Sequence, residues 1–193
     1  MKKIAVFCGA SIGFNTIYRD EAIALGNYFA KHKIAMVFGG GKIGMMGAIA
    51  DEMLKNKGEV IGVIPHLLRH EEVEHNGVTK MIISKNMSDR KVIISKMVDG
   101  YIALPGGFGT LDEIFEALTL GQLGIEAKPV GILNTNGFYD AMLQQLDVMV
   151  KEGFLRKENR AMLLVHESIP ELLKAMYTYR APIVTKVVNT VGS

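Results

Sequence analysis

Short, continuously apolar segments alternate with longer amphipathic segments along most of the chain. The apolar segments predict strands at 3–7, 34–38, 60–64, 80–83, 101–104, 130–133 and 163–165. The amphipathic segments predict helices at 17–32, 45–56, 88–97, 110–120, 139–151 and 169–179. Strands that are apolar throughout, without polar alternation, are typical of a parallel sheet that helices cover on both faces.

This repeated strand–helix order predicts an α/β fold, namely a doubly wound, mostly parallel, Rossmann-like sheet flanked by helices. We expect a single domain over residues 1–181 and a short C-terminal tail over 182–193. Ligands of such sheets bind outside the carboxyl ends of the strands. The candidate site residues are therefore those that follow Phe7, Phe38, Ile64, Ile83 and Leu104.

The composition of the chain excludes several functional classes. Its 193 residues are 49% hydrophobic and 22% charged, with a formal net charge of +2. So small a charge, without a basic stripe, argues against nucleic-acid binding. Cys8 is the only cysteine, which excludes disulfides and cysteine-based zinc sites and fits a reducing cytoplasm. No apolar run approaches the roughly 20 residues of a membrane-spanning helix, so we expect no membrane partner.

A glycine-rich loop follows the second predicted strand and reads Gly-Gly-Gly-Lys-Ile-Gly-Met-Met-Gly over residues 39–47. It contains G-x-G-x-x-G, and Glu59 follows about 20 residues later, as in a dinucleotide fingerprint. That interpretation would make the protein a nicotinamide oxidoreductase, but the motif follows the second strand instead of the first. A tight turn that needs glycine for packing explains the loop as well.

A second glycine loop, Pro105-Gly106-Gly107-Phe108-Gly109-Thr110, lies between a predicted strand and a predicted helix. Backbone N–H groups at a helix N-terminus, together with a threonine hydroxyl, form a cradle for phosphate. The loop lacks the Gly-Lys-Ser/Thr of a triphosphate site. We therefore expect it to bind a monophosphate without a metal ion or other cofactor.

Two charged residues, Arg90 and Glu113, belong to helices at the same edge of the predicted sheet. Glu113 is expected in the first turn of its helix, off the apolar face, either as a partner of the helix dipole or as a site carboxylate. Arg90 follows Ser88, a candidate N-cap, and heads an apolar face. A desolvated guanidinium needs an anionic partner, which is either a structural carboxylate or a substrate anion.

Three further features of the sequence complete the expectations. Thr119 lies two turns after Asp112 and is expected to reach the same cleft. The histidines and glutamates over 70–75 lack the spacing of a zinc site, so a solvated loop is favoured there. The 12 methionines are assigned to core packing.

The segments Pro105-Gly-Gly-Phe-Gly-Thr-Leu-Asp-Glu113 and Met87-Ser-Asp-Arg-Lys91 resemble the LOG (Lonely Guy) family. This resemblance extends over nearly the whole chain, although Ala10, Ser88-Asp89 and Asp112 depart from the common pattern. It implies a homodimer with sites near the subunit contact, and catalysis by Arg90 and Glu113. The substrate-binding residues that it implies are Glu72, Arg90, Lys91, Gly106, Gly107, Phe108, Gly109, Thr110, Leu111, Asp112, Glu113 and Thr119.

The resemblance further implies hydrolysis of the N-glycosidic bond of nucleoside 5′-monophosphates to free base and ribose 5-phosphate. Both AMP and its N6-substituted, cytokinin-type analogues fit this expectation. A carboxylate near the sugar agrees with it, because such bonds break through an oxocarbenium-like transition state. The alternative is a carrier on the same fold that binds a phosphorylated, nucleotide-like cofactor without catalysis. A carrier would need the phosphate cradle but would have no use for Glu113.

Overall fold

A computed structural model describes residues 1–69 and 74–182. Within them, seven parallel strands form one sheet in the order β4-β3-β2-β1-β5-β6-β7. The strands are β1 (Lys3–Phe7), β2 (Ala35–Phe38), β3 (Val60–Pro65), β4 (Lys80–Ser84), β5 (Gly100–Ala103), β6 (Val130–Leu133) and β7 (Leu163–His166). The predicted doubly wound α/β sheet is confirmed. Glu72, with its neighbours 70, 71 and 73, and the predicted tail after Pro182 lie outside the described residues.

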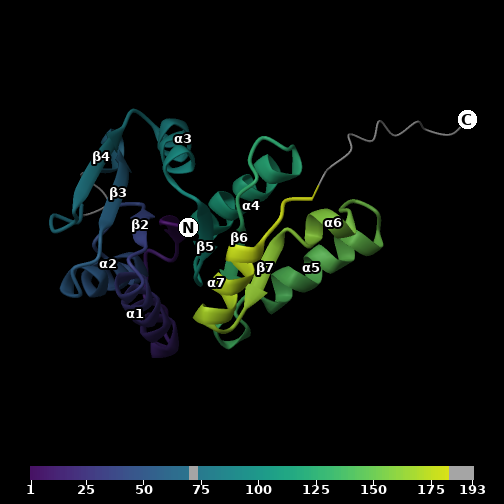
Figure 1. Cartoon of the computed structure of the whole chain (residues 1–193), viewed down its shortest axis with the longest axis horizontal. Helices are drawn as coiled ribbons and strands as arrows, with labels where there is room; N and C mark the ends of the chain where they lie inside the picture. Colours follow the sequence, from purple (N-terminus) through teal and green to yellow (C-terminus); the bar gives the residue numbers. More distant parts are fainter. Residues whose placement is uncertain (70–73, 183–193) are drawn as a thin grey trace, which may run out of the picture.

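Helices connect successive strands, as the amphipathic segments predict. They are α1 (Thr16–Lys31), α2 (Gly44–Lys55), α3 (Met87–Met97), α4 (Phe108–Gln122), α5 (Asp140–Lys151), α6 (Lys157–Arg160) and α7 (Ile169–Thr178), with 3₁₀ turns η1 (His66–Arg69) and η2 (Thr135–Gly137). The predictions omit α6, η1 and η2, because one turn of helix is too short to show a periodic pattern. Figure 1 shows α1 and α2 beside one end of the sheet and α5 to α7 beside the other.

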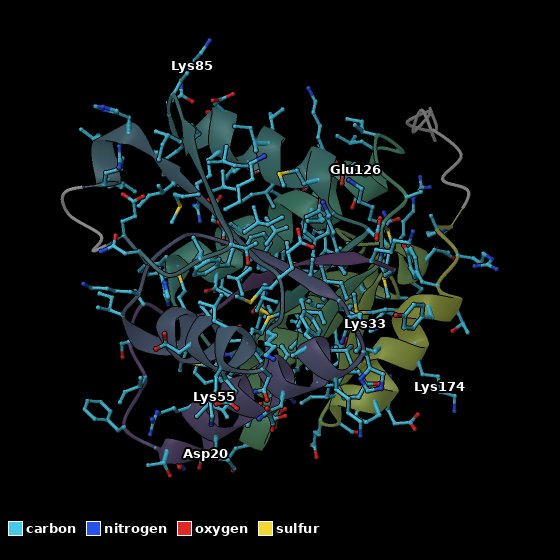
Figure 2. The ribbon with its side chains drawn as sticks, turned by 60° about the vertical axis from the view of Figure 1, so that its left-hand side comes forward. Asp20, Lys33, Lys55, Lys85, Glu126 and Lys174 are labelled. Atoms are coloured by element: carbon cyan, nitrogen blue, oxygen red, sulfur yellow. The ribbon has the colours of Figure 1, made fainter. Side chains whose placement is uncertain are left out.

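The sheet separates two apolar cores. On β1, Ile4 and Val6 pack with α1, α2 and α7, whereas Ala5 and Phe7 pack with α3, α4 and α5. Successive residues of a strand point to opposite faces, so a strand between two helical layers must be apolar at every position. Charged side chains such as Asp20, Lys85 and Lys174 project outward from these layers (Figure 2). In the part of the chain that the structure describes, we find no helix both long and apolar enough to cross a membrane.

The order of the strands reverses between β1 and β5, which pair directly. Connections from β1 and β5 leave in opposite directions at this point, which opens a crevice at the carboxyl edge. Hydrogen bonds join the two loops there, from Gly9 N–H to Pro105 O (3.0 Å) and from Leu104 N–H to Phe7 O (2.9 Å). The Met45 N–H group also donates to Gly9 O (3.2 Å), so both glycine-rich loops lie beside the switch point of the sheet.

The starts of two helices differ from the predictions. The N-cap of α3 is Asn86 and not Ser88, because the Asn86 side chain accepts a hydrogen bond from Asp89 N–H (2.8 Å). α4 begins at Phe108, two residues before the predicted start, with Gly107 as its N-cap. Glu113 consequently lies in the second turn of α4, and the expectation of a first-turn position is wrong.

Candidate active site

Arg90 on α3 and Glu113 on α4 form an ion pair at the carboxyl edge of the sheet. The Nη1 atom of Arg90 lies 3.0 Å from Oε1 of Glu113, and the two side chains are only 12% and 11% exposed. The Arg90 Nε–H group donates to the carbonyl oxygen of Val63, at 3.0 Å. The anionic partner that a desolvated guanidinium requires is therefore a carboxylate of the same chain, and the pair is held in one orientation.

The first glycine loop packs against this pair. A Cβ atom at Gly39 would lie 2.6 Å from Nη2 of Arg90, so only glycine leaves room for the guanidinium. Gly44, with φ +65°, lies so close to Ala10 that a Cβ atom would come within 2.2 Å of the Ala10 carbonyl. Packing explains these two glycines, in agreement with the interpretation of this loop as a tight turn.

The second glycine loop leads into α4. The first hydrogen bond of this helix runs from Leu111 N–H to Gly107 O (3.2 Å). Helix geometry leaves the preceding N–H groups, those of Phe108, Gly109 and Thr110, without acceptors inside the helix. Gly109 and Thr110 line a pocket at the crevice, so these N–H groups form a set of donors suited to an anion.

The glycines of this second loop differ in what surrounds them. A Cβ atom at Gly106 would lie 2.2 Å from the Thr110 hydroxyl oxygen, so packing within the loop requires that glycine. Cβ atoms at Gly107 and Gly109 would meet nothing within 4 Å, and neither residue has a positive φ. Contacts within the described chain therefore do not account for Gly107 and Gly109, whereas the close approach of a ligand would.

A pocket of about 280 Å³ brings these features together. Its described lining residues are Cys8, Gly9, Ala10, Met46, Leu68, Met87, Arg90, Gly107, Gly109, Thr110 and Glu113. Met46, Leu68 and Met87 were not among the predicted site residues, and the methionines were expected in the core. Two of these residues, Met46 and Met87, follow the carboxyl ends of β2 and β4, which is the signal that could have identified them.

Cys8 lies in this pocket but is not a nucleophile. Burial, and secondly the charge of Glu113, raises the pKa of the Cys8 thiol far above its ordinary value. A thiol reacts through its thiolate form. Cys8 therefore stays protonated at neutral pH and contributes packing instead of chemistry.

Other predicted site residues lie around the pocket or away from it. Phe108 is 93% exposed at the start of α4, and Leu111 packs against the core. Lys91 and Asp112 form an ion pair of 2.8 Å outside the pocket lining. Thr119 does not line this pocket within the chain but lines a separate groove between α4 and α5. It lies two turns after Asp112, as predicted, and Asp112 is itself outside the pocket lining.

Metal binding has no obvious place among these side chains. Over residues 1–69 and 74–182, we find no cluster of three histidine, cysteine, aspartate or glutamate residues close enough to hold a metal ion. The positive charge at the pocket comes instead from Arg90 and from the N-terminus of α4.

Comparisons with known proteins place this arrangement in a family. A family model described as "Possible lysine decarboxylase" matches residues 46–176. A cytokinin riboside 5′-monophosphate phosphoribohydrolase of Arabidopsis thaliana, named as a LOG protein, is 42% identical over 178 residues, which are 92% of this chain and 84% of the relative. The chain belongs to the LOG family. Another LOG protein with the same activity in its name, from Oryza sativa subsp. japonica, is 39% identical over 92% of this chain and 74% of its own.

Solved structures share the fold of this LOG-family chain at lower identity. A molybdenum cofactor binding protein of Rippkaea orientalis gives a TM-score of 0.68 at 23% identity, over 91% of this chain and 97% of the other. The molybdenum cofactor carrier protein of Chlamydomonas reinhardtii gives 0.66 at 21% identity, over 91% and 95%. At such identities the likeness confirms the Rossmann-like fold and carries no argument about ligands.

Proposed function

We propose that this LOG-family chain hydrolyses the N-glycosidic bond of AMP or of an N6-substituted, cytokinin-type nucleoside 5′-monophosphate. The products are the free base and ribose 5-phosphate. The observation that carries the proposal is the buried Arg90–Glu113 pair, which lies in one pocket with the N-terminus of α4. The activity in the names of its LOG relatives supports the same reaction.

The geometry suggests a division of labour within the pocket. The 5′-phosphate binds to the N–H groups at the start of α4, beside Gly107 and Gly109, with Thr110 in the same wall. The sugar then extends toward Glu113, and the base toward the apolar side chains of Met46 and Met87. These flexible, polarisable walls tolerate substituents of different shape, so AMP and N6-substituted analogues both fit.

In the reaction, water attacks C1′ and loses a proton, and the bond between C1′ and the base nitrogen breaks. The departing base keeps the electron pair of that bond and takes up a proton from solvent. The Glu113 carboxylate stabilises the oxocarbenium-like transition state and orients or deprotonates the water. Arg90 is always protonated, so it does not act as a base but holds Glu113 ionised and in place. We propose that no metal ion takes part, so excess EDTA should leave turnover unchanged.

Two other activities fit the pocket less well. Decarboxylation of lysine, which the family description names, requires a lysine that forms a Schiff base with a pyridoxal cofactor. No lysine stands among the described lining residues of the pocket. A carrier of a nucleotide-like cofactor would use the phosphate cradle, but it would gain nothing from a buried carboxylate beside the sugar.

Incubation with AMP tests the proposal. We expect free adenine and ribose 5-phosphate in equal amounts, separated by chromatography, and no release by the E113Q variant. Binding of AMP without release of adenine would support the carrier instead. The oxidoreductase interpretation of the first glycine loop would instead require oxidation or reduction of a nicotinamide cofactor.

We also propose that the chain acts in the cytoplasm as a homodimer. The buried, free thiol of Cys8 suits a reducing compartment. A groove of about 320 Å³ between α4 and α5 is lined mainly by apolar side chains, and Phe154 beside α5 is 89% exposed. Exposed apolar surface of this kind is typical of an interface between subunits. A nucleotide contact through Thr119 would require that this groove face the site of a second copy.

A further inference from the structure

We propose that Lys91 is a positioning residue for Glu113, acting through Asp112 and Glu116, and is not a ligand of the nucleotide. The inference rests on the proposed function, since it concerns the carboxylate to which we assign the catalytic role. It departs from the role in substrate binding that the family resemblance implies for Lys91.

Consecutive cations of α3 bind neighbouring carboxylates of α4. Arg90 pairs with Glu113, and the ammonium of Lys91 lies 2.8 Å from Asp112 and in still closer contact with Glu116. The two helices are thus joined by a cluster of two cations and three carboxylates, which we call the α3–α4 charge cluster. Glu113 lies inside it, flanked along its own helix by Asp112 and, one turn later, by Glu116.

The side chain of Lys91 lies beside a cavity that also adjoins Glu113. Lys91 is absent from the described lining of the nucleotide pocket and contributes instead to this separate cavity of about 30 Å³. Glu113 and Glu116 line the same small cavity, as do Ser95 and Tyr101. Lys91 and Glu113 therefore share the lining of a small cavity that is separate from the described lining of the nucleotide pocket.

The environment keeps the Lys91 ammonium charged. Desolvation by itself would lower its pKa, but the hydrogen bonds and charges of Asp112 and Glu116 outweigh desolvation and raise that pKa. The ammonium consequently balances one of the two carboxylates that flank Glu113. Without it, Arg90 alone would face three negative charges, and a like charge nearby disfavours ionisation of a carboxyl group.

Few other titratable groups face Glu113 within the described part of the chain. Cys8 approaches it from the end of β1, and Tyr101 on β5 faces the same small cavity. Burial, and then the hydrogen bond to Glu126, raises the pKa of the Tyr101 phenol, and burial likewise raises the pKa of the Cys8 thiol. Both groups stay neutral between pH 4 and 9, so neither adds a charge to those of the α3–α4 charge cluster.

The decisive experiment compares K91Q with three other variants across pH. K91R restores the charge, and K91Q/E116Q removes one positive and one negative charge together. K96Q makes the same charge change at an exposed lysine of α3 and serves as the matched control. Two quantities are measured from pH 4 to 9, namely kcat for AMP and the titration of the Glu113 carboxyl by ¹³C NMR, assigned with E113Q.

We expect K91Q to move the acid limb of kcat, and the Glu113 titration with it, upward by about one pH unit. The KM for AMP at pH 8 should change by less than threefold. K91R, K91Q/E116Q and K96Q should all stay close to the wild-type profile.

A tenfold rise in KM with an unmoved Glu113 titration would show that Lys91 binds substrate, and would overturn the proposal. The NMR titration decides the matter even if the wild-type protein releases no adenine from AMP. In that case the proposed function fails, while an upward shift in K91Q would still establish that Lys91 controls Glu113.

Discussion

The position of Glu113 in the second turn of α4 separates two explanations for a carboxylate near a helix N-terminus. A charge that serves only the helix dipole acts within the first turn and contributes about 0.3–1 kcal/mol. Glu113 lies beyond that turn, is 11% exposed and pairs with an arginine that is equally buried. Burying this carboxylate costs desolvation free energy without benefit to the helix. A role in the proposed hydrolysis explains the burial better.

Replacing Glu113 by glutamine tests this assignment. The amide keeps an oxygen that accepts a hydrogen bond from Arg90 but carries no charge, so kcat for AMP should fall at least about 100-fold. Because the charge of the ion pair is lost, E113Q should be less stable by about 1–2 kcal/mol, a fall in Tm of roughly 2–8 °C. Turnover and calorimetry are compared with E171Q, an exposed glutamate of α7. Turnover of E113Q near that of E171Q would contradict the catalytic role.

Glu126, in the loop between α4 and β6, is expected to make the stability of the fold depend on pH. Its carboxylate accepts hydrogen bonds from the Ser95 hydroxyl and from the Tyr101 phenol (2.7 Å), and Lys128 lies 3.5 Å away. Burial would raise the Glu126 pKa, but these hydrogen bonds and the lysine charge outweigh burial and lower it. Nothing in the sequence pattern around Glu126 indicated this network, because Ser95 and Tyr101 come from two other segments, α3 and β5.

A carboxyl group with a lowered pKa stabilises the folded state above its unfolded pKa of about 4.3 and loses that contribution as pH falls through the folded value. Urea unfolding should therefore show E126Q to be less stable than wild type at pH 7. The difference should shrink when both are measured near pH 3.5. An equal difference at both pH values would mean that shape, and not charge, explains the effect.

At the scale of the element, the N-terminus of α4 makes substrate choice depend on phosphate. Binding energy from the 5′-phosphate orients the sugar toward Glu113, so its loss should lower kcat as well as raise KM. A site built around a polar group rejects an analogue that lacks it by roughly 10⁴-fold. We expect kcat/KM for adenosine to be lower than for AMP by about this factor.

ATP should also be a poor substrate, because the loop has neither the lysine nor the metal-binding hydroxyl of a triphosphate site. The three substrates are compared under one set of conditions. Cleavage of adenosine within about tenfold of AMP, a gap of only ~1.4 kcal/mol, would mean that the second glycine loop does not bind phosphate.

Substitution of Gly107 and Gly109 distinguishes a role in ligand binding from a role in folding. Alanine at either position meets open space in the protein, so G107A and G109A should unfold within about 1 kcal/mol of wild type. A methyl group would occupy the path of the phosphate, and KM for AMP should rise at least about tenfold. G39A is the informative contrast, because its methyl group would displace Arg90 and should lower kcat. Unchanged KM in G107A and G109A would remove the support for a phosphate cradle.

The elements themselves were largely predictable from the sequence, and the directions of their side chains were not. β1 and β6 have the predicted bounds because a buried parallel strand is apolar throughout. The start of α4 was predicted two residues too late, because glycine at 107 and 109 disfavours helix locally. Tertiary structure overrides that preference. The ion pairs of Lys91 with Asp112 and Glu116 were not predicted from the sequence, because they depend on the packing of α3 on α4.

At the scale of the whole molecule, the groove between α4 and α5 predicts the oligomeric state. Light scattering should give twice the 21.2 kDa mass of one chain. Met149 lines this groove, so M149E should place a charge in the interface and shift the protein toward monomer. A24E, on exposed α1 at the other face of the sheet, is the matched control. A monomeric wild type would contradict the homodimer, without bearing on the chemistry of Glu113.

The first residue and the last described helix meet at the edge of the sheet opposite the pocket. The Tyr177 hydroxyl donates to the carbonyl oxygen of Met1, at 3.4 Å, and β1 begins there before running toward the pocket. A peptide tag or a fused carrier domain attached at Met1 would therefore leave the crevice facing away from its attachment. Protein immobilised on a solid support through this corner should keep its access to nucleotide, whereas attachment through Lys42, within the first glycine loop, should obstruct it.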